Sequence, residues 1–319
     1  MKVSILVPVY GVEPFIEECA VSLFEQSYKD LEYIFVDDCS PDKSIEVLED
    51  VINRYPDREK QVRIIHNEIN RGSGATRSIA LAAATGDYVM FVDSDDVITT
   101  DAVEKLYIQQ EKTNADIVDG ALCRLTPTGL NTPTYPYHGE SPDTLCLILA
   151  KNTVSHNAWA RLIRKSLFDS YHIDFVEGIN MAEDYSIMAR LMFYATRSCI
   201  DDIIYYYRIN DSGTFASGLN RKNINSFIDA NSLVGDFLAK NDQKGVFRFP
   251  YELGMLQTYH SALQVGLSRK EIDERSHYRP SIPLFRCLHS LFCHHCSRRL
   301  LYAVYLVVKR LYKKSFFKK

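Results

Sequence analysis

The sequence has no acidic residues in its last part. From Arg275 to Lys319 it contains eleven Lys and Arg residues and no Asp or Glu. The whole chain has a net charge of −4, so residues 1–274 carry −15, which is −4 minus 11. We infer that a basic C-terminal segment follows an acidic main part. The acidic main part, together with the absence of a basic-aromatic pattern, opposes binding to nucleic acid.

The chain also lacks a long apolar segment and an export signal. The apolar run 300–308 has nine residues and follows two arginines, whereas a membrane-spanning helix needs about 20 apolar residues. The first eight residues are too short and too strand-like for a signal peptide. We therefore expect a cytoplasmic protein, in which the eight cysteines are reduced thiols without disulfides.

Three carboxylates follow a short apolar run and are the most informative feature of the chain. Tyr88 to Val92 reads as a buried strand, and Asp93, Asp95 and Asp96 come directly after it. Crowded carboxylates repel one another, and a divalent cation with a substrate phosphate in its shell would relieve this repulsion. The alternative is a solvated turn in which Asp96 caps the next helix.

Short apolar runs alternate with amphipathic segments over the first part of the chain. The pattern predicts strands at 3–9, 31–36, 62–66 and 88–92, and helices at 14–26, 43–54, 75–85 and 101–112. This alternation is typical of a mostly parallel sheet with right-handed crossovers. Ligands bind such sheets at the carboxyl ends of the strands, where the sequence places Tyr10, Asp37, Asp38, Asn70, Arg71 and the acids of 93–96.

Four motifs, in this order, closely resemble the family 2 glycosyltransferases. They are VSILVPVY at 3–10, VDDCSPD at 36–42, NRGSGATR at 70–77 and GDYVMFVDSDD at 86–96, and the likeness continues at 157–162, 175–184 and 206–208. The resemblance implies an α/β fold called GT-A, a Rossmann-like and mostly parallel sheet flanked by helices, over residues 1–215. It also implies a role in bacterial capsular, exopolysaccharide or O-antigen synthesis. Residues 216–319 are expected to form a helical C-terminal region.

The resemblance assigns a set of residues to the nucleotide of a UDP-sugar. Tyr10 would stack on the uracil, and Asp38, with Asp37 beside it, would accept a base N–H. Arg77 would either counter the diphosphate or form a structural pair with Asp93. The turn at 72–74 is not a dinucleotide fingerprint, because the third glycine of G-x-G-x-x-G is replaced by Arg77. The complete predicted set is Pro8, Tyr10, Asp37, Asp38, Asn70, Arg77, Asp93 and Ser94.

The resemblance also implies a metal and a general base. Asp95 is the predicted ligand of Mg²⁺ or Mn²⁺, with Asp93 holding the ribose or a metal-bound water, and the metal would assist departure of the nucleoside diphosphate. Glu183 and Asp184 precede an apolar helical stretch. One of them, with Asp184 preferred, would deprotonate the acceptor hydroxyl; the alternative is helix N-terminal stabilisation.

Two residues are predicted on the acceptor side. Trp159, the one Trp of the chain, would stack on an acceptor sugar or belong to the core. Arg161 stands where the resemblance expects Lys, which keeps the charge and changes its geometry.

The C-terminal region is predicted to be helical at 223–238 and 251–265 and to end in a basic amphipathic tail at about 284–319. Apolar and basic residues alternate in this tail, which favours a helix lying on an anionic membrane surface. The alternative is an ordinary helix docked on the protein. A cluster of Cys287, His289, Cys293, His294, His295 and Cys296 is too compressed along the chain for a typical zinc site.

The sequence therefore predicts an inverting, metal-dependent glycosyltransferase at the inner face of a bacterial membrane. It would transfer a sugar from a UDP-sugar to a hydroxyl of a saccharide, expected to be lipid-linked. A sugar-1-phosphate nucleotidyltransferase is one alternative, but it would require a Gly-rich, basic loop after the first strand, and residues 8–13 contain no Lys or Arg. The other alternative is a non-catalytic saccharide- or nucleotide-binding relative.

Overall fold

The computed structural model describes residues 1–126, 129–130, 132–151, 154–209, 218, 220–291 and 298–316. The chain forms two compact units with interleaved ranges. We call them the sheet unit (Met1–His138, Asn157–Gly178 and Tyr194–Ala216) and the helical unit (Gly139–His156, Ile179–Phe193 and Ser217–Lys319). The predicted division at 215/216 falls outside the described residues and stays a prediction.

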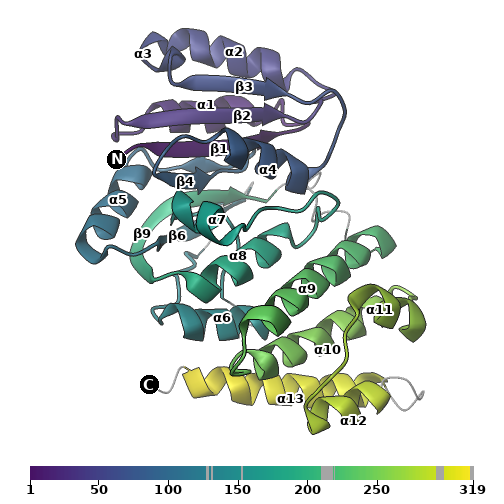
Figure 1. The fold of residues 1–319 in the computed structure, drawn as a ribbon. Helices are drawn as coiled ribbons and strands as arrows, with labels where there is room; N and C mark the ends of the chain where they lie inside the picture. Colours follow the sequence, from purple (N-terminus) through teal and green to yellow (C-terminus); the bar gives the residue numbers. More distant parts are fainter. Residues whose placement is uncertain are drawn as a thin grey trace. The chain divides into compact units, whose positions relative to one another are not determined.

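The sheet unit is built on a single sheet with the strand order β3-β2-β1-β4-β8-β6-β9-β5 (Figure 1). Its strands are β1 Val3–Val9, β2 Leu31–Asp37, β3 Val62–His66, β4 Tyr88–Phe91, β5 Val97–Ile98, β6 Ile117–Thr126, β7 Gly129–Leu130, β8 Arg161–Arg164 and β9 Arg197–Arg208. The first four strands are parallel, as the alternation predicts. The remainder is mixed, because β8 runs antiparallel to both β4 and β6.

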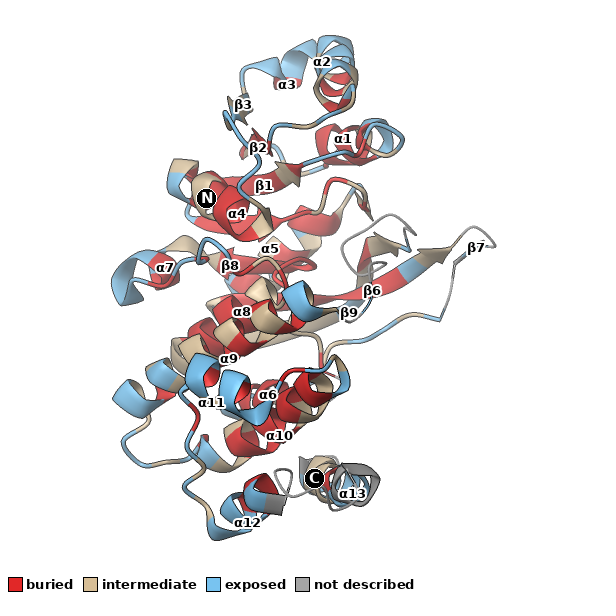
Figure 2. Cartoon of the chain, turned by 90° about the vertical axis from the view of Figure 1, so that its right-hand side faces the viewer, coloured by how far each residue is buried: buried red, intermediate tan, exposed pale blue. Residues whose placement is uncertain are grey.

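Helices cover both faces of the parallel strands, which explains why these strands are apolar on both sides (Figure 2). They are α1 Ile16–Phe24, α2 Ser44–Arg54, α3 Pro56–Glu59, α4 Ser73–Ala83, α5 Ala102–Thr113 and α7 Lys165–Tyr171. Val3, Ile5 and Val7 of β1 share a core cluster with residues of α1, α2 and α5, whereas α4 packs against β1 and β2. The predicted strands and helices of this part are confirmed, and none of their ends is shifted by more than two residues.

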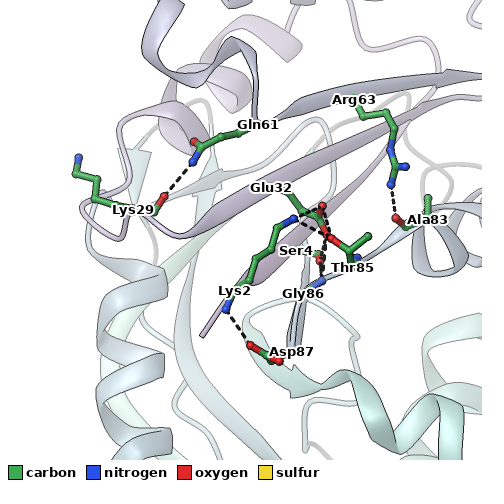
Figure 3. Close-up of polar contacts among 10 residues, drawn as sticks. All are labelled: Lys2, Ser4, Lys29, Glu32, Gln61, Arg63, Ala83, Thr85, Gly86 and Asp87. Carbon is green, nitrogen blue, oxygen red and sulfur yellow. Dashed lines mark hydrogen bonds and ion pairs between the residues drawn. The ribbon is translucent and has the colours of Figure 1, made fainter.

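A closed polar network lies at the amino ends of the parallel strands (Figure 3). The Glu32 carboxylate accepts hydrogen bonds from Lys2 Nζ (2.8 Å), Ser4 Oγ (2.5 Å) and the backbone N–H of Thr85 (2.6 Å). Burial raises the pKa of Glu32, but these donors outweigh it and lower the pKa to about 2. A Cβ on Gly86 would lie 2.7 Å from Ser4 Oγ, so the network requires glycine there.

The helical unit is arranged around α10 Arg248–Gln264, which packs against α6, α9, α11, α12 and α13. Its helices are α6 Ser141–Leu149, α8 Glu183–Tyr194, α9 Arg221–Asn241, α10, α11 Arg269–Ser276, α12 Pro283–Leu291 and α13 Arg298–Phe316. Gly254 lets α10 approach α6 closely, because a Cβ there would overlap the carbonyl oxygen of Leu149. The helices predicted at 223–238 and 251–265 are confirmed as α9 and α10. In the described part of the chain, no helix has the length and apolar content needed to cross a membrane.

Candidate active site

The acids that follow β4 lie next to the point where the strand order reverses. β2 and β3 extend the sheet on one side of β1, and β4 lies on its other side, so the crevice at the carboxyl ends of β1 and β4 is where this class of sheet binds ligands. Asp96 is fully buried there. Its carboxylate accepts hydrogen bonds from Tyr205 Oη and from the backbone N–H of Arg208, both at 2.7 Å.

Burial, and then the charges of Asp93 and Asp95, raise the pKa of Asp96 well above its usual value. The alternative that Asp96 caps the next helix is wrong, because α5 begins at Ala102 after the intervening strand β5. The fixed carboxylate of Asp96 instead ties the acidic turn to β9. This turn is therefore a built part of the fold and not a solvated loop.

Arg208 organises the same turn, a role that the sequence did not reveal. Its Nε donates to the backbone carbonyl of Asp95 at 2.9 Å, and its guanidinium also pairs with Glu18 and lies over the ring of Phe15. Arg208 therefore fixes the backbone of Asp95, and the side chain of Asp95 is half-buried. Tyr205 adds a second link, since its hydroxyl accepts from the backbone N–H of Asp93.

Arg77 forms an ion pair with Asp93, with Nη2 at 2.6 Å from Oδ1. Arg77 is 6% exposed and extends from α4, which packs on the sheet. Of the two roles predicted for Arg77, the structural pair with Asp93 is therefore present in the structure. Asp93 therefore has one carboxylate oxygen already paired within the protein.

Asp37 is the last residue of β2, Asp38 follows it, and both hold the neighbouring loop. Asp38 is 3% exposed, and its two oxygens accept from Asn67 Nδ2 and from the backbone N–H groups of Arg71 and Gly72, each at 2.8 Å. Asp37 accepts from the backbone N–H of Ser40 and contacts the His66 ring. Asp38 therefore has a structural role that was not predicted, and its contact with a base stays a prediction.

The other predicted nucleotide residues differ in accessibility. Tyr10, directly after β1, is 51% exposed, which leaves its ring available for stacking. Asn70 is exposed, Pro8 is half-buried and Ser94 is buried. Tyr10 is the only one of these four that is a large, exposed apolar side chain.

Trp159 and Arg161 are both buried in the sheet unit. The Trp159 ring is 7% exposed and stacks on Tyr205 (4.6 Å between ring centroids) and Tyr207 (5.3 Å). This burial fits the core interpretation of Trp159 better than stacking on a sugar. Arg161 is 2% exposed and forms an ion pair with Asp119.

The two remaining candidates, Glu183 and Asp184, are in the first turn of α8 and belong to the helical unit. Both are half-buried. The chain that leads into α8 is fixed to α9 by Ser226, whose hydroxyl accepts from the backbone N–H groups of Asn180 and Met181. A carboxylate in the first turn of a helix interacts favourably with the helix dipole.

The acidic turn fits a divalent cation that takes few protein ligands. In the described ranges, no group of three or more His, Cys, Asp or Glu side chains is arranged to hold a metal. Mg²⁺, however, is usually bound by one or two carboxylates, with substrate phosphates and waters completing its shell. Of the Cys/His cluster that is too compressed for a typical zinc site, Cys293, His294, His295 and Cys296 lie outside the described residues, and Cys287 is exposed.

Comparison with known proteins gives the family. Residues 4–169, a little over half of the chain, match the family model of glycosyl transferase family 2. The chain is 34% identical over 218 residues to the uncharacterized glycosyltransferase EpsJ of Bacillus subtilis, covering 65% of this chain and 61% of that protein. This chain belongs to glycosyl transferase family 2.

Solved structures confirm the predicted fold class. Staphylococcus aureus TarS 1–349 in complex with UDP-GlcNAc superposes with a TM-score of 0.62 at 18% identity, over 100% of this chain and 92% of that one. The mannosyltransferase PcManGT from Pyrobaculum calidifontis, in complex with GDP-Man and Mn²⁺, has a TM-score of 0.53 at 15% identity, over 98% and 88%. The chain spans only 61% of EpsJ and between 34% and 40% of two further curated relatives.

Proposed function

We propose that this protein is an inverting glycosyltransferase that moves a sugar from a UDP-sugar to a hydroxyl of a saccharide acceptor. The observation that carries the proposal is the acidic turn after β4, held by Tyr205 and Arg208 at the point where the strand order reverses. Family membership and the UDP-GlcNAc complex of the similarly folded TarS support it.

On the donor side, Tyr10 stacks on the uracil, since its ring is exposed at the end of β1 and aromatic stacking accepts any base face. Asp38 keeps the loop around Arg71 and Gly72 in place beside the nucleotide. Asp93, paired with Arg77, is oriented towards the ribose or a metal-bound water. Asp95 is the residue that holds the metal.

Asp95 would hold Mg²⁺ or Mn²⁺, and the cation, when bound, would supply stabilisation of the negative charge on the nucleoside diphosphate leaving group. The Mn²⁺ in the PcManGT complex supports this choice. The chain's own contribution is to fix the Asp95 backbone through Arg208, so that little reorganisation is needed when the donor binds.

On the acceptor side, Asp184 removes the proton from the attacking hydroxyl. A base acting on the acceptor, together with a separately held leaving group, implies a single displacement and inversion at the anomeric carbon. Glu183, one residue earlier in the same helical turn, is the second candidate for this base. The acceptor is a lipid-linked saccharide that is an intermediate in the synthesis of a surface polysaccharide.

The C-terminal helix supports attachment to a membrane surface. Tyr305, Lys309 and Tyr312 lie on one face of α13, where Tyr305 Oη and Lys309 Nζ donate to Gln257 of α10. Val307 and Leu311 are 59% and 64% exposed, and the exposed cations Arg310 and Lys314 lie beside them. A helix that is docked by one face and presents apolar and basic residues on another suits an anionic lipid surface.

This geometry changes how attachment must be tested. A chain ending near Pro283 would lose Phe285 and Tyr305, which are 0% and 1% exposed in the core of the helical unit. Such a truncation would confuse unfolding with loss of attachment. Substitutions on the exposed face of α13 avoid this problem.

The function is tested by measuring release of UDP from several UDP-sugars, each with a panel of simple acceptor glycosides. We expect acceptor-dependent release of UDP with at least one donor. Release of pyrophosphate from a sugar-1-phosphate and UTP would favour the nucleotidyltransferase instead, and nucleotide binding without turnover would favour a non-catalytic relative.

A further inference from the structure

Three side chains of the sheet unit form a chain of contacts that the proposed function does not use. Cys199 Sγ lies 3.3 Å from Nδ1 of His138, and Nε2 of the same ring lies 2.8 Å from Oδ1 of Asp201. All three residues belong to the sheet unit. A thiol, an imidazole and a carboxylate in this order are the parts of an activated nucleophile, in which the imidazole accepts the thiol proton and the carboxylate orients the imidazole.

The first part of β9 carries two of these side chains. β9 runs beside β6 (Figure 1), with Cys199 opposite Asp119 and Ile203 opposite Ala121. Residues 200–202 of β9 therefore face a single residue of β6, which is a β-bulge. Bulges redirect side chains, and the side chain of Asp201, within this bulge, is 58% exposed.

The segment that carries His138 is held on the same strand. Arg197 Nη1 donates to the backbone carbonyl of Tyr137 at 2.5 Å, and its Nε donates to Asp119 at 2.6 Å. The residue before His138 is thus fixed by a buried guanidinium, whereas the side chain of His138 is 61% exposed. The contact between Cys199 and His138 is therefore built into the fold and lies at the surface.

The contacts also define which nitrogen of the neutral His138 ring carries the proton. A carboxylate only accepts hydrogen bonds, so Nε2 donates to Asp201, and the lone pair of Nδ1 faces the thiol. Burial raises the pKa of Cys199; the charge of Arg197 lowers this pKa, and the charges of Asp119 and Asp201 raise it. The thiol is therefore protonated near neutral pH and requires a base, but once deprotonated it is a strong nucleophile, because the nucleophilicity of a thiolate increases with its pKa.

The geometry restricts the reactions that this thiol can enter. The two nitrogens of an imidazole point away from each other, so His138 cannot bring Cys199 and Asp201 to the same metal ion. Attack on an ester or amide forms an oxyanion, which requires hydrogen-bond donors placed to receive it, whereas attack on a disulfide forms none. Because Cys199 is half-buried, a small disulfide is the reagent that fits best.

We propose that Cys199 is a modification site that exchanges with small disulfides, with His138 as its general base and Asp201 as a positioning residue. His138 Nδ1 takes the thiol proton while Sγ attacks one sulfur of the disulfide. The S–S bond of the disulfide breaks, and the departing sulfur takes the proton from Nδ1. Cys199 is thereby oxidised to a mixed disulfide, and the other half of the reagent leaves as a reduced thiol.

The test measures how fast each cysteine of the full chain forms a mixed disulfide with bis(2-hydroxyethyl) disulfide at neutral pH, by mass spectrometry of the peptides. This probe is small and neutral, so charges near a cysteine neither attract nor repel it. Cys39 is the internal reference, because it is exposed and, in the described part of the chain, has no hydrogen bond to a histidine. We expect Cys199 to react at least about tenfold faster than Cys39.

Two substitutions separate the base from the residue that positions it. His138→Ala should slow the reaction of Cys199 by about 100-fold, the lower part of the range for a positioned base. Added imidazole should restore part of this rate, because the position that it would occupy is exposed. Asp201→Asn should slow the reaction less, and Asp201→Glu should keep more of the rate than Asp201→Asn. Equal losses in these two variants would contradict the positioning role.

Asp202→Asn is the matched control, because this neighbouring acid pairs with Lys105 and not with His138. It should react like the wild type, and the thermal midpoints of all variants should be unchanged. The proposal is overturned if Cys199 reacts no faster than Cys39, if His138→Ala reacts like Asp202→Asn, or if imidazole restores no rate to His138→Ala. No sugar transfer is measured, so the outcome is independent of the proposed glycosyltransferase activity.

Discussion

Carboxylates at the two ends of the parallel strands have pKa values that are shifted in opposite directions. At the amino ends, Glu32 is surrounded by donors from Lys2, Ser4 and Thr85, and its pKa falls to about 2. At the carboxyl ends, Asp96 is buried near Asp93 and Asp95, and its pKa rises. The first arrangement satisfies one carboxylate completely, whereas the second concentrates acids in one turn.

This difference separates a structural site from a functional one. A carboxylate that is fully paired within the protein contributes stability and has little capacity left for a ligand. Crowded acids cost stability, and strongly perturbed pKa values of this kind are frequent at functional sites. The comparison therefore predicts that acids at the carboxyl ends control activity, and that acids at the amino ends control stability.

The largest effect is expected for Asp95→Asn. Loss of the metal ligand removes stabilisation worth several kcal/mol, so transfer should fall by about three orders of magnitude while the fold is retained. Initial rates of UDP release, with circular dichroism of both proteins, measure this. Chelation with EDTA should abolish activity of the wild type in the same assay.

Asp87→Asn is the matched control, because Asp87 precedes β4 as Asp95 follows it, and accepts from the backbone N–H of Lys2. This variant should keep its activity. Full activity of the wild type in EDTA, or an equal loss in both variants, would contradict the assignment of Asp95.

The next effect is expected for Asp184→Asn. Removal of a general base should lower kcat by roughly 10²–10⁴-fold, while UDP affinity, measured by calorimetry, should be unchanged. Glu183→Gln, at the neighbouring position in α8, is the comparison and should have the smaller effect. A large loss of UDP binding in Asp184→Asn would move this residue to the donor side.

A smaller effect, on stability alone, is expected for Glu32→Gln. The folded-state pKa of Glu32 is lowered from 4.5 to about 2, so its contribution is fully present above pH 4.5 and is lost as the pH falls towards 2. The pKa shift corresponds to roughly 3 kcal/mol, and solvent screening of the partly exposed Lys2 pair reduces it, so urea unfolding at pH 7 should show a loss of about 2 kcal/mol. The difference between variant and wild type should disappear near pH 2.

Glu49→Gln, an exposed position on α2, should not change the unfolding midpoint at any of these pH values. If Glu32→Gln lowers kcat without changing stability, the separation between the two ends of the strands is not valid.

The sequence predicted the strands and the acidic turn because both depend on local patterns. Short apolar runs predict buried strands, and polar residues that follow parallel strands collect at one edge. Long-range pairs have no such local signal. Asp95 and Arg208 are 113 positions apart, and the burial of Trp159 depends on stacking with two residues of β9.

For some site residues the sequence allowed two roles, and only the packing of the folded chain distinguishes between them. Arg77 could bind a diphosphate or pair with Asp93, and the sequence is the same in both cases. The structure contains the pair because α4 brings the guanidinium within 2.6 Å of Asp93. In the helical unit, periodicity predicted α9 and α10, but the close approach of α10 to α6 at Gly254 depends on a long-range contact that no local pattern encodes.

The smallest effect concerns α13. One face of this helix is expected to serve stability and another to serve function, as the two ends of the parallel strands do. Tyr305 and Lys309 are bound to Gln257 and should matter for stability, whereas Arg310 and Lys314 are exposed and should matter for attachment. Reversing both exposed charges, Arg310→Glu with Lys314→Glu, should weaken sedimentation with anionic liposomes at least tenfold, since each cation contributes about 1 kcal/mol.

The matched control is Lys222→Glu with Lys240→Glu on α9, which has the same net charge as the α13 double variant and should sediment like the wild type. High salt should reduce the difference, and transfer to a water-soluble acceptor should be unchanged in all forms. Equal sedimentation of the two double variants would mean that α13 is a docked structural helix only.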